Sequence, residues 1–452
     1  MYINKIKQVA SFFEKNKKDD ILFCPACHIE HTGRNAYSIK IFLYLYEKTG
    51  EKYYFDFAYS VVKNIMNKLK YPPESNGKYK VFYPGLYGGS QNNASNVIES
   101  GISTDMVAEF LLFCKNKKIE ILEYQKWFNE LYDHIYGYLF EASLSKSCLN
   151  QRLWGLSGIA TFYKLTKDSK LKLHIQESLK KFFSEQNSDG SFNYIVNKKS
   201  IDAQFSLYYF SRVLTFAQYC MEAVNDFSYK KQMKKALILL IDCYDEKYNK
   251  ILALESKKWF FTASYEIESL SYDIFLMKTY KMDDVCEKQI SFYFEHINEN
   301  GVNSNLEKKP NLSCAFIDNS DFVWFIRALE VQKYQEFNYV KVDRIYKDAG
   351  IEIKFQKEYK EIRYFKQELF NSNWGSMNNL RVRVYQEKTY YIFPRHYYKF
   401  ALHPRLKINL ANLRNILKMS KYNLDYFGVR KRYIVKKIFD TLKYDLLLNG
   451  YK

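Results

Sequence analysis

A short N-terminal string gathers side chains that bind metals. Residues 24–31 read CPACHIEH, so two thiols and two imidazoles fall within eight positions. Zinc could use such ligands, and the CxxCH spacing is that of c-type haem attachment. Haem attachment requires export, and the N-terminus lacks the apolar core of a signal peptide. Ligands this close together cannot easily surround one ion, so zinc stays an alternative and we expect no metal and no cofactor.

The same string has an interpretation without metal. It is a loop that leads into the first strongly apolar segment, with its cysteines buried. Such a loop brings His28, His31 and Arg34 toward a cavity, where the imidazoles could exchange protons and the guanidinium could bind an anion.

A second loop, over residues 79–96, reads YKVFYPGLYGGSQNNASN. Its three glycines give a flexible backbone, its tyrosines offer flat rings for sugars, and its amides suit sugar hydroxyls. No Walker or Rossmann glycine spacing occurs, so it is no phosphate-binding loop. Because long loops in compact domains are commonly functional, we expect a lid or substrate-binding role rather than an ordinary surface excursion. The side chains concerned are Tyr83, Tyr87, Asn92, Asn93 and Asn96.

Polar side chains also recur near the starts of six apolar segments. Any one of them is more often a helix cap than a catalyst, and Asp202 and Asp318 occupy positions where N-caps belong. The same bias at six independent starts nevertheless favours one shared site. The further candidates are Glu99, Asp105, Arg152, Trp154, Asp202, Gln204, Glu266, Glu268, Asp273, Asp318, Asp321 and Trp324.

The six apolar segments predict helices that are covered on nearly all sides. They begin near Thr32, Ser100, Leu153, Ser200, Ser264 and Cys314. The intervals of 68, 53, 47, 64 and 50 residues each accommodate a helical hairpin. Helices with one apolar stripe lie between them, for example Phe57, Val61, Ile65 and Leu69, or Leu171, Ile175, Leu179 and Phe183. Six inner helices covered by six striped ones make an (α/α)6 toroid, in which all inner-helix starts meet at one end.

The turns before the inner helices carry a resemblance. Asn76-Gly77, Asp189-Gly190 and Asn300-Gly301 are turn dipeptides. The segment QNSDGSF at 186–192 resembles the loop before inner helices in α/α-toroid enzymes, which include six-hairpin glycosidases, toroidal polysaccharide lyases, uronyl C5-epimerases and terpene cyclases. The resemblance extends as an architecture over about residues 20–345 and implies a carbohydrate-active enzyme. The aspartate-rich clusters of terpene cyclases are missing.

Composition agrees with helices, and the charge points to an anionic partner. Only 16 Gly and 7 Pro occur in 452 residues, too few for a turn-dense β-sandwich or propeller. Residues 369–452 hold 17 basic and 4 acidic side chains, which is +13 of the total charge of +19. We predict a mainly α protein with a toroid over 1–349 and a small basic α+β module over 350–452. The alternating segments 381–385 and 389–393 predict two or three strands in this module, followed by a basic helix over about 408–445. Its partner would be an acidic polysaccharide or oligosaccharide, with an anionic membrane surface as a peripheral contact; nucleic acid is the least supported because no binding motif accompanies the charge.

Two chemistries suit such a cavity. Proton abstraction from C5 of a uronic acid, by a lyase or epimerase, would use Arg34, His28, His31, Asn92, Asn93, Tyr83 and Tyr87. Glycoside hydrolysis would draw two carboxylates from Glu99, Asp105, Asp202, Glu266, Asp318 and Asp321. Arg152, Trp154, Gln204, Asn96 and Trp324 would bind the substrate in either case. The alternative is a non-catalytic toroid that docks to an anionic glycan or membrane. The scattered cysteines indicate buried free thiols, so we expect a cytoplasmic protein.

Overall fold

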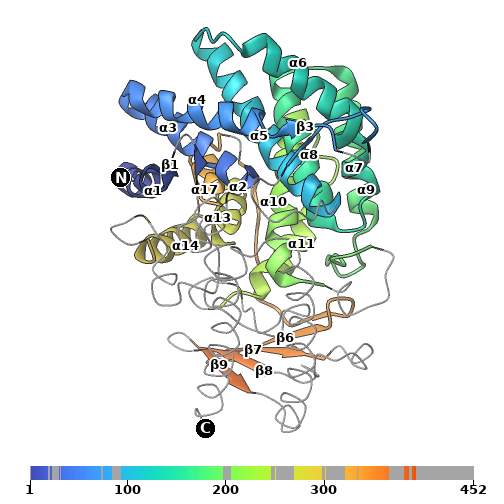
Figure 1. Ribbon diagram of the computed structural model, residues 1–452. Coiled ribbons are helices and arrows are strands. Elements are labelled where there is room, and N and C mark those ends of the chain that lie inside the picture. Colours follow the sequence, from blue (N-terminus) through green and yellow to red (C-terminus); the bar gives the residue numbers. More distant parts are fainter. Residues whose placement is uncertain are drawn as a thin grey trace, which may run out of the picture.

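A computed structural model of the chain shows a ring of helices with a small sheet beside it (Figure 1). It describes residues 2–18, 21–22, 30, 32–72, 75–83, 93–196, 205–245, 250, 269–297, 301, 321–332, 334–365, 381–385 and 389–392. For residues 93–96, 381–382 and 389–392 it describes the backbone alone. Within these ranges, no helix has the length and apolarity that a membrane span requires.

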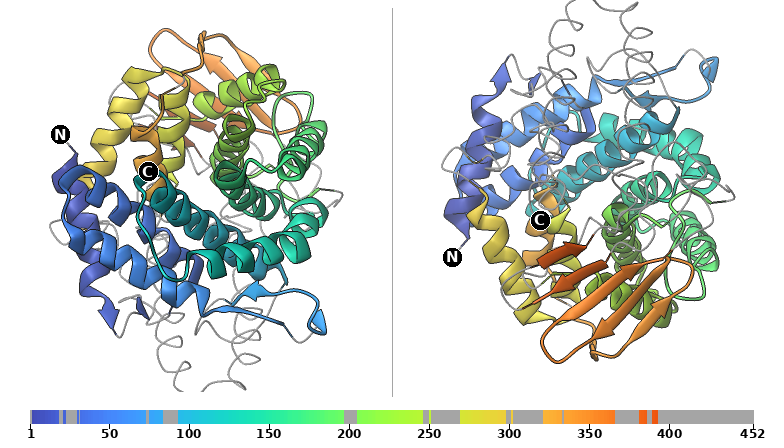
Figure 2. Two further views of the ribbon diagram at one scale, coloured as in Figure 1. Left: turned by 90° about the horizontal axis from the view of Figure 1, so that it is seen from above. Right: turned by 90° about the horizontal axis from the view of Figure 1, so that it is seen from below.

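Six helices form a closed inner ring, in which each contacts the next and the last returns to the first (Figure 2). In ring order they are α3 (Ser38–Thr49), α5 (Asn93–Lys117), α8 (Leu149–Thr166), α10 (Leu207–Val224), α13 (Leu270–Thr279) and α17 (Val323–Leu329). A short helix, α2 (Thr32–Ala36), precedes α3 and packs on α5. Burial is nearly complete around these helices: α8 buries fourteen of its eighteen residues and α10 fifteen of eighteen. This matches helices covered on almost all sides.

The outer helices each cover an inner one with a single apolar face. They are α1 (Ile3–Lys15), α4 (Lys52–Met66), α6 (Tyr124–His134), α9 (Ser169–Ser184), α11 (Lys230–Asp242) and α14 (Asp283–Glu295). Helix α6 continues through a π-helical turn (Ile135–Leu139) into α7 (Phe140–Ser145). The predicted stripes are buried, including Phe57, Val61 and Ile65 on α4. The (α/α)6 toroid predicted from these periodicities is confirmed.

Two glycines let α5 and α8 approach closely. A Cβ atom on Gly101 would overlap the carbonyl of Trp154, and one on Gly158 would lie 2.6 Å from the carbonyl oxygen of Gly101. Both contacts would be closer than a real Cβ atom can approach, so a larger residue at position 101 or 158 would push the two helices apart. The close approach brings Asp105 on α5 into hydrogen-bonding distance of Thr161 on α8.

A five-stranded antiparallel sheet follows the last inner helix. Its strands are β5 (Arg344–Tyr346), β6 (Ile351–Phe355), β7 (Lys360–Tyr364), β8 (Arg381–Val384) and β9 (Thr389–Ile392), paired in chain order. Two short hairpins, β1 (Lys17–Lys18) with β2 (Ile21–Leu22) and β3 (Leu69–Lys70) with β4 (Val81–Phe82), lie within the toroid sequence. The predicted strands at 381–385 and 389–393 are present as β8 and β9, and three more precede them. The predicted basic helix at 408–445 falls outside the described residues, and the boundary at 350 stays a prediction.

Asp242, the last residue of α11, attaches the sheet to the toroid. Its carboxylate accepts hydrogen bonds from the hydroxyls of Tyr339 and Tyr346, and from Arg344 at 3.0 Å. The amine of Lys360 donates to the backbone carbonyl of Asp242 at 2.9 Å. These bonds satisfy polar groups at the carboxyl end of the helix and hold the sheet against α11.

Candidate active site at the centre of the toroid

Asp321 lies at the centre of a buried polar cluster inside the ring. One carboxylate oxygen accepts hydrogen bonds from Arg34 Nη1 at 2.6 Å and from the Tyr272 hydroxyl at 2.8 Å. The other accepts one from Arg212 Nη2 at 2.8 Å. All four side chains are buried, Asp321 completely. We call these four residues the Asp321 cluster; it joins α2, α10, α13 and the turn before α17.

Burial and the Asp321 charge determine the protonation states in this cluster. Burial opposes the charge on Arg34, but Asp321 together with Tyr272 and Tyr37 outweighs it, so the pKa of Arg34 is raised. Burial, followed by the charge of Asp321, raises the pKa of Tyr272 well above its ordinary value and that of Tyr37 likewise. The guanidinium therefore stays charged and both phenols stay protonated at neutral pH. They can donate hydrogen bonds, but neither phenol is a ready base.

Aromatic rings stand beside the two guanidiniums. The indole of Trp154 donates from Nε1 to the Tyr37 hydroxyl at 3.0 Å. The Arg34 guanidinium lies 5.4 Å from the centre of the Trp154 ring, and that of Arg212 lies 5.9 Å from it. Trp324 lies 5.6 Å from the Tyr272 ring. The two indoles are almost fully buried, and rings at these distances stabilise the guanidiniums by cation–π attraction.

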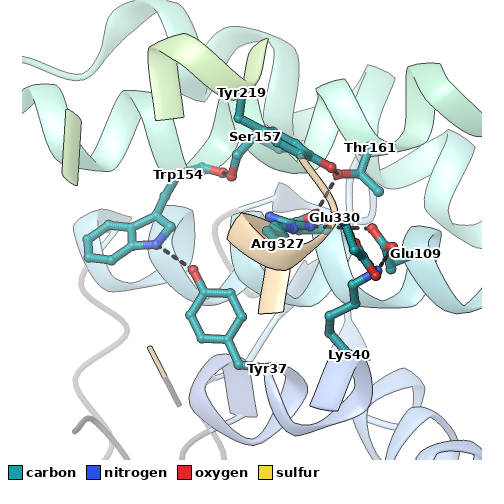
Figure 3. A network of polar contacts seen from close by, with 10 residues as sticks. Tyr37, Lys40, Glu109, Trp154, Ser157, Thr161, Tyr219, Arg327 and Glu330 are labelled. Carbon is teal, nitrogen blue, oxygen red and sulfur yellow. Dashed lines mark hydrogen bonds and ion pairs between the residues drawn. The ribbon is translucent and has the colours of Figure 1, made fainter. Parts of the chain in front are cut away.

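Asp105 forms a second cluster deeper along the ring axis. Its carboxylate binds Arg327 through two hydrogen bonds, at 2.7 and 2.9 Å, and also accepts one from Thr161. The Thr161 hydroxyl in turn contacts the Tyr219 hydroxyl at 2.7 Å. Figure 3 shows Arg327, Thr161 and Tyr219 in this arrangement, with Glu109 beside them. We call Asp105, Glu109, Thr161, Tyr219 and Arg327 the Asp105 cluster.

A chain of ion pairs extends the Asp105 cluster to the surface. Arg327 lies 3.4 Å from Glu109, Lys40 binds Glu109 at 2.7 Å, and Lys40 also binds Glu330 at 2.8 Å (Figure 3). Burial would raise the pKa of Glu109, but the charges of Lys40 and Arg327 lower it to about 2. Glu109 is therefore ionised throughout the neutral range. This cluster is a closed set of opposite charges, which suits a structural role at the floor of the site.

The two clusters lie at different positions along the inner helices. Asp321 is in the turn before α17, whereas Arg327 is in the last turn of that helix. The neighbouring segment of the ring contacts both clusters: Arg34 on α2 binds Asp321, and Lys40 on α3 binds Glu109.

Glu99 on α5 differs from the other carboxylates. Its side chain is partly exposed and accepts a hydrogen bond from the backbone N–H of Gly33, next to Arg34. Burial raises the pKa of Glu99, and the hydrogen bond from the Gly33 backbone N–H and the nearby Arg34 charge only partly offset this. Glu99 is therefore a carboxyl group that can hold a proton at higher pH than an exposed glutamate, which is the property of a general acid or base.

The predicted site residues fall into three groups. Arg34, Asp105, Asp321, Trp154 and Trp324 lie in or against the two clusters, with Glu99 beside Arg34. Two residues lie away from the clusters. Arg152 on α8 pairs with Glu185, directly after α9, with its Nη1 3.0 Å from the carboxylate. Tyr83 directly follows β4, and its hydroxyl lies 3.4 Å from the Tyr71 carbonyl. Outside the described residues are Cys24, Cys27, His28, His31, Tyr87, Asn92, Asp202, Gln204, Glu266, Glu268 and Asp318, and of Asn93 and Asn96 only the backbone, in the first turn of α5, is described.

Several cluster residues were missed by sequence reasoning. Arg212 and Arg327 stand within almost purely apolar stretches, YYFSRVLTF and VWFIRALE. A single arginine in a helix that must be buried needs an acidic partner, and this signal could have identified both. Tyr37, Tyr219 and Tyr272 carried no comparable signal, because this sequence has 42 tyrosines.

The donor set in the described part of the ring is one of arginines, carboxylates and phenols. Among the described residues, no group of three or more His, Cys, Asp and Glu side chains could hold a metal ion. Asp273, another of the predicted candidates, is fully buried on α13 and forms an ion pair with the amine of Lys250.

Comparison with known proteins identifies the fold. No family profile matches the sequence, and no curated protein matches it. Among solved structures, the chain is similar to cellobiose 2-epimerase from Bacillus thermoamylovorans, with 11% identity, a TM-score of 0.53 and coverage of 72% of this chain and 99% of that one. It is also similar to a D-mannose isomerase, with 9% identity, a TM-score of 0.51 and coverage of 72% and 96%. A family 76 glycoside hydrolase from a bovine Bacteroides thetaiotaomicron strain gives 11% identity, a TM-score of 0.51 and coverage of 73% and 77%. The resemblance to six-hairpin carbohydrate enzymes expected from the sequence is thus present in the fold.

Proposed function

We propose that this chain is a carbohydrate-active enzyme that acts on an acidic sugar by removing the proton next to its carboxylate. The observation that carries the proposal is the convergence of Arg34, Arg212 and Tyr272 on Asp321 at the starts of the inner helices. Arginine binds carboxylates through planar, charge-assisted hydrogen bonds. The fold is shared with a cellobiose 2-epimerase and a mannose isomerase, whose names describe changes at sugar carbons.

Arg34 and Glu99 are the residues placed to meet a substrate. The Arg34 side chain keeps 11% exposure, whereas that of Asp321 has none. Among the described residues, Arg34 donates a side-chain hydrogen bond only through Nη1, so its other N–H groups are available to a sugar carboxylate. Glu99, partly exposed and next to Arg34, is within reach of the same substrate.

The reaction then follows from the charges. The substrate carboxylate binds Arg34, and the Glu99 carboxylate takes the proton from C5. The electron pair left on C5 moves into the substrate carboxylate, where the guanidinium stabilises the added charge. If the C4–O bond then breaks, its electron pair leaves with the glycosidic oxygen and a C4–C5 double bond forms. If a proton returns to the other face of C5, the product is the epimer.

Glu99 also supports a second candidate, glycoside hydrolysis. A carboxyl group with a raised pKa can protonate the glycosidic oxygen, while an ionised carboxylate acts as nucleophile or as base toward water. Glu99 has the first property. Asp321 is completely buried between Arg34 and Arg212, so the second carboxylate would come from Asp202, Glu266 or Asp318, the further carboxylates near predicted inner-helix starts. Both candidates therefore require Glu99, and they differ in the product.

The experiment incubates the purified chain with polyuronides and with neutral polysaccharides of the same linkage. A lyase releases unsaturated, ultraviolet-absorbing uronates, a hydrolase releases reducing ends without new absorbance, and an epimerase leaves the chain length unchanged while C5 takes up deuterium from heavy water. Glu99→Gln should reduce any of these by at least about 100-fold, as expected for a lost acid–base group. Glu177→Gln, an exposed change on α9, is the matched control.

The outcomes separate the candidates. Unsaturated or deuterated products that disappear in Glu99→Gln support proton abstraction. Reducing ends without absorbance would replace it by hydrolysis. Turnover that survives Glu99→Gln would refute the assignment of this residue. Binding of an acidic glycan without turnover on any polymer would favour the non-catalytic toroid.

A further inference from the structure

A groove lies between the toroid and the sheet, away from the centre of the ring. It has a volume of about 630 Å³ and is bounded by the end of α11, by α14, by the segment before β5, by the β6–β7 hairpin and by β8. Its volume is within the range of small-molecule and oligosaccharide sites. The bonds of Asp242 with Tyr339, Tyr346 and Arg344 hold the two walls together, so the groove exists only because the sheet is docked.

Lysines dominate the charge of this groove. The lining contains four lysines, Lys288, Lys341, Lys357 and Lys360, and two acidic residues, Asp245 and Glu358. Lys360 belongs to the floor, where its amine donates to the carbonyls of Asp242 and Tyr244 at 2.9 and 2.6 Å. Burial lowers its pKa to about 8, and the charge of Lys341 contributes, which indicates that the two amines are near each other. Lys341 and Lys357 are exposed, and no ion pair within the described ranges involves either.

Aromatic side chains line the groove between these amines. Tyr244, Tyr339, Phe355, Tyr359 and Tyr385 all contribute to the surface. Tyr359 and Tyr385 are adjacent, with ring centres 5.1 Å apart, and the hydroxyl of Tyr339 is fixed to Asp242. Tyrosines held in place offer flat, amphipathic contact surface at small entropic cost.

We propose that this groove binds a stretch of acidic oligosaccharide, with the sugar rings on the tyrosines and the carboxylates on Lys341 and Lys357. Amines at the rim attract an anionic chain, and the rings select sugars over simple anions. The groove would hold the polymer on the enzyme beside the toroid. The choice of a sugar chain as the ligand rests on the proposed function; the preference for an anion rests on the lysines alone.

Titration calorimetry of the full chain tests this with two probes, a hexasaccharide of galacturonic acid and the neutral galactose hexasaccharide of the same linkage. Lys341→Ala with Lys357→Ala should weaken binding of the acidic probe about tenfold, as expected for two exposed ion pairs. Lys347→Ala with Lys354→Ala removes the same charge from exposed positions outside the groove and should leave the affinity unchanged. Tyr359→Leu should weaken the acidic probe several-fold, because it keeps an apolar side chain but loses the ring.

Salt and turnover complete the test. Raising salt from about 0.05 to 0.3 M should weaken the acidic probe in the wild type more than in the double variant. Equal affinity for the neutral probe, an equal loss in the control pair, or an unchanged affinity in Tyr359→Leu would each overturn the proposal. Calorimetry needs no turnover, so failure of the proposed function would leave this result intact. If turnover is found, the groove variant should raise KM for polymer while kcat on a disaccharide stays unchanged.

Discussion

Replacing Asp105 with Asn should destabilise the toroid strongly. Asp105 and Arg327 are 0% and 4% exposed and share two hydrogen bonds, at 2.7 and 2.9 Å. Asparagine keeps the shape and the contact with Thr161. Among the described residues, the buried Arg327 guanidinium then has Glu109, at 3.4 Å, as its one anionic partner. Removing one partner of a buried pair costs about 3–5 kcal/mol, and the residual Glu109 contact places our expectation at about 3 kcal/mol.

Urea unfolding followed by far-ultraviolet circular dichroism measures this loss. The control is Asp56→Asn, which removes an exposed pair with Lys52 on α4 and should cost less than about 0.5 kcal/mol. Arg327→Met alone leaves Asp105 without its cation, so it too should be costly. The double variant removes both charges and should cost less than the sum of the single changes by at least about 2 kcal/mol. A loss under about 1 kcal/mol in Asp105→Asn, or additive single effects, would refute the view that this pair is a buried, mutually dependent unit.

Three further perturbations test other features. Burial raises the pKa of Glu99, so the wild type loses stability as pH rises from the unfolded-state pKa of this group through its folded-state pKa. Glu99→Gln should therefore gain stability relative to wild type between pH about 4 and 7. An equal pH dependence of the free energy of unfolding in the two proteins, measured with urea, would contradict this. Burial lowers the pKa of His134 to about 4, so wild-type stability should fall as pH drops from about 6.5 to 4, and His134→Asn should fall less over that interval, whatever its stability at pH 7. Gly101→Ala should lower the free energy of unfolding by about 1–3 kcal/mol because its Cβ would overlap the Trp154 carbonyl. Gly155→Ala is the control and should be tolerated, because the atoms nearest to its Cβ are 3.4 Å away. Equal losses of stability in the two variants would show that the close approach of α5 and α8 is unimportant.

The helical ring was accessible from the sequence because burial leaves a local record. A helix covered on all sides is apolar at nearly every position, as in α10, and a covering helix is apolar at i and i+4, as in α4. The closure of the ring also followed, because six such pairs at similar intervals leave no face uncovered. The sheet was underestimated. Strands β6 (IEIKF) and β7 (KEIRY) alternate apolar and polar residues as β8 (RVRV) does, and their buried positions follow that alternation. The signal for these strands was therefore present in the sequence but was not used.

The candidate site was only partly accessible. Arg34, Asp105 and Asp321 were found because polar residues near inner-helix starts are conspicuous. Their partners were not, since Arg212 lies 109 positions from Asp321 and Arg327 lies 222 from Asp105. Arg152 shows the converse: it stands at the expected helix start, yet its direction around α8 brings it to Glu185.

By itself, the sequence determined which segments are inner and outer helices, because the period of apolar residues reports directly which sides of a helix are covered. Tertiary structure alone decided which charges pair, how deep each lies and where a groove forms. Those properties depend on the rotation and spacing of helices brought together by ring closure, and on the docking of a sheet by Asp242 of α11 with residues about a hundred positions further along the chain. No local pattern encodes them, since each partner is an ordinary arginine, tyrosine or lysine until the fold places it beside the other.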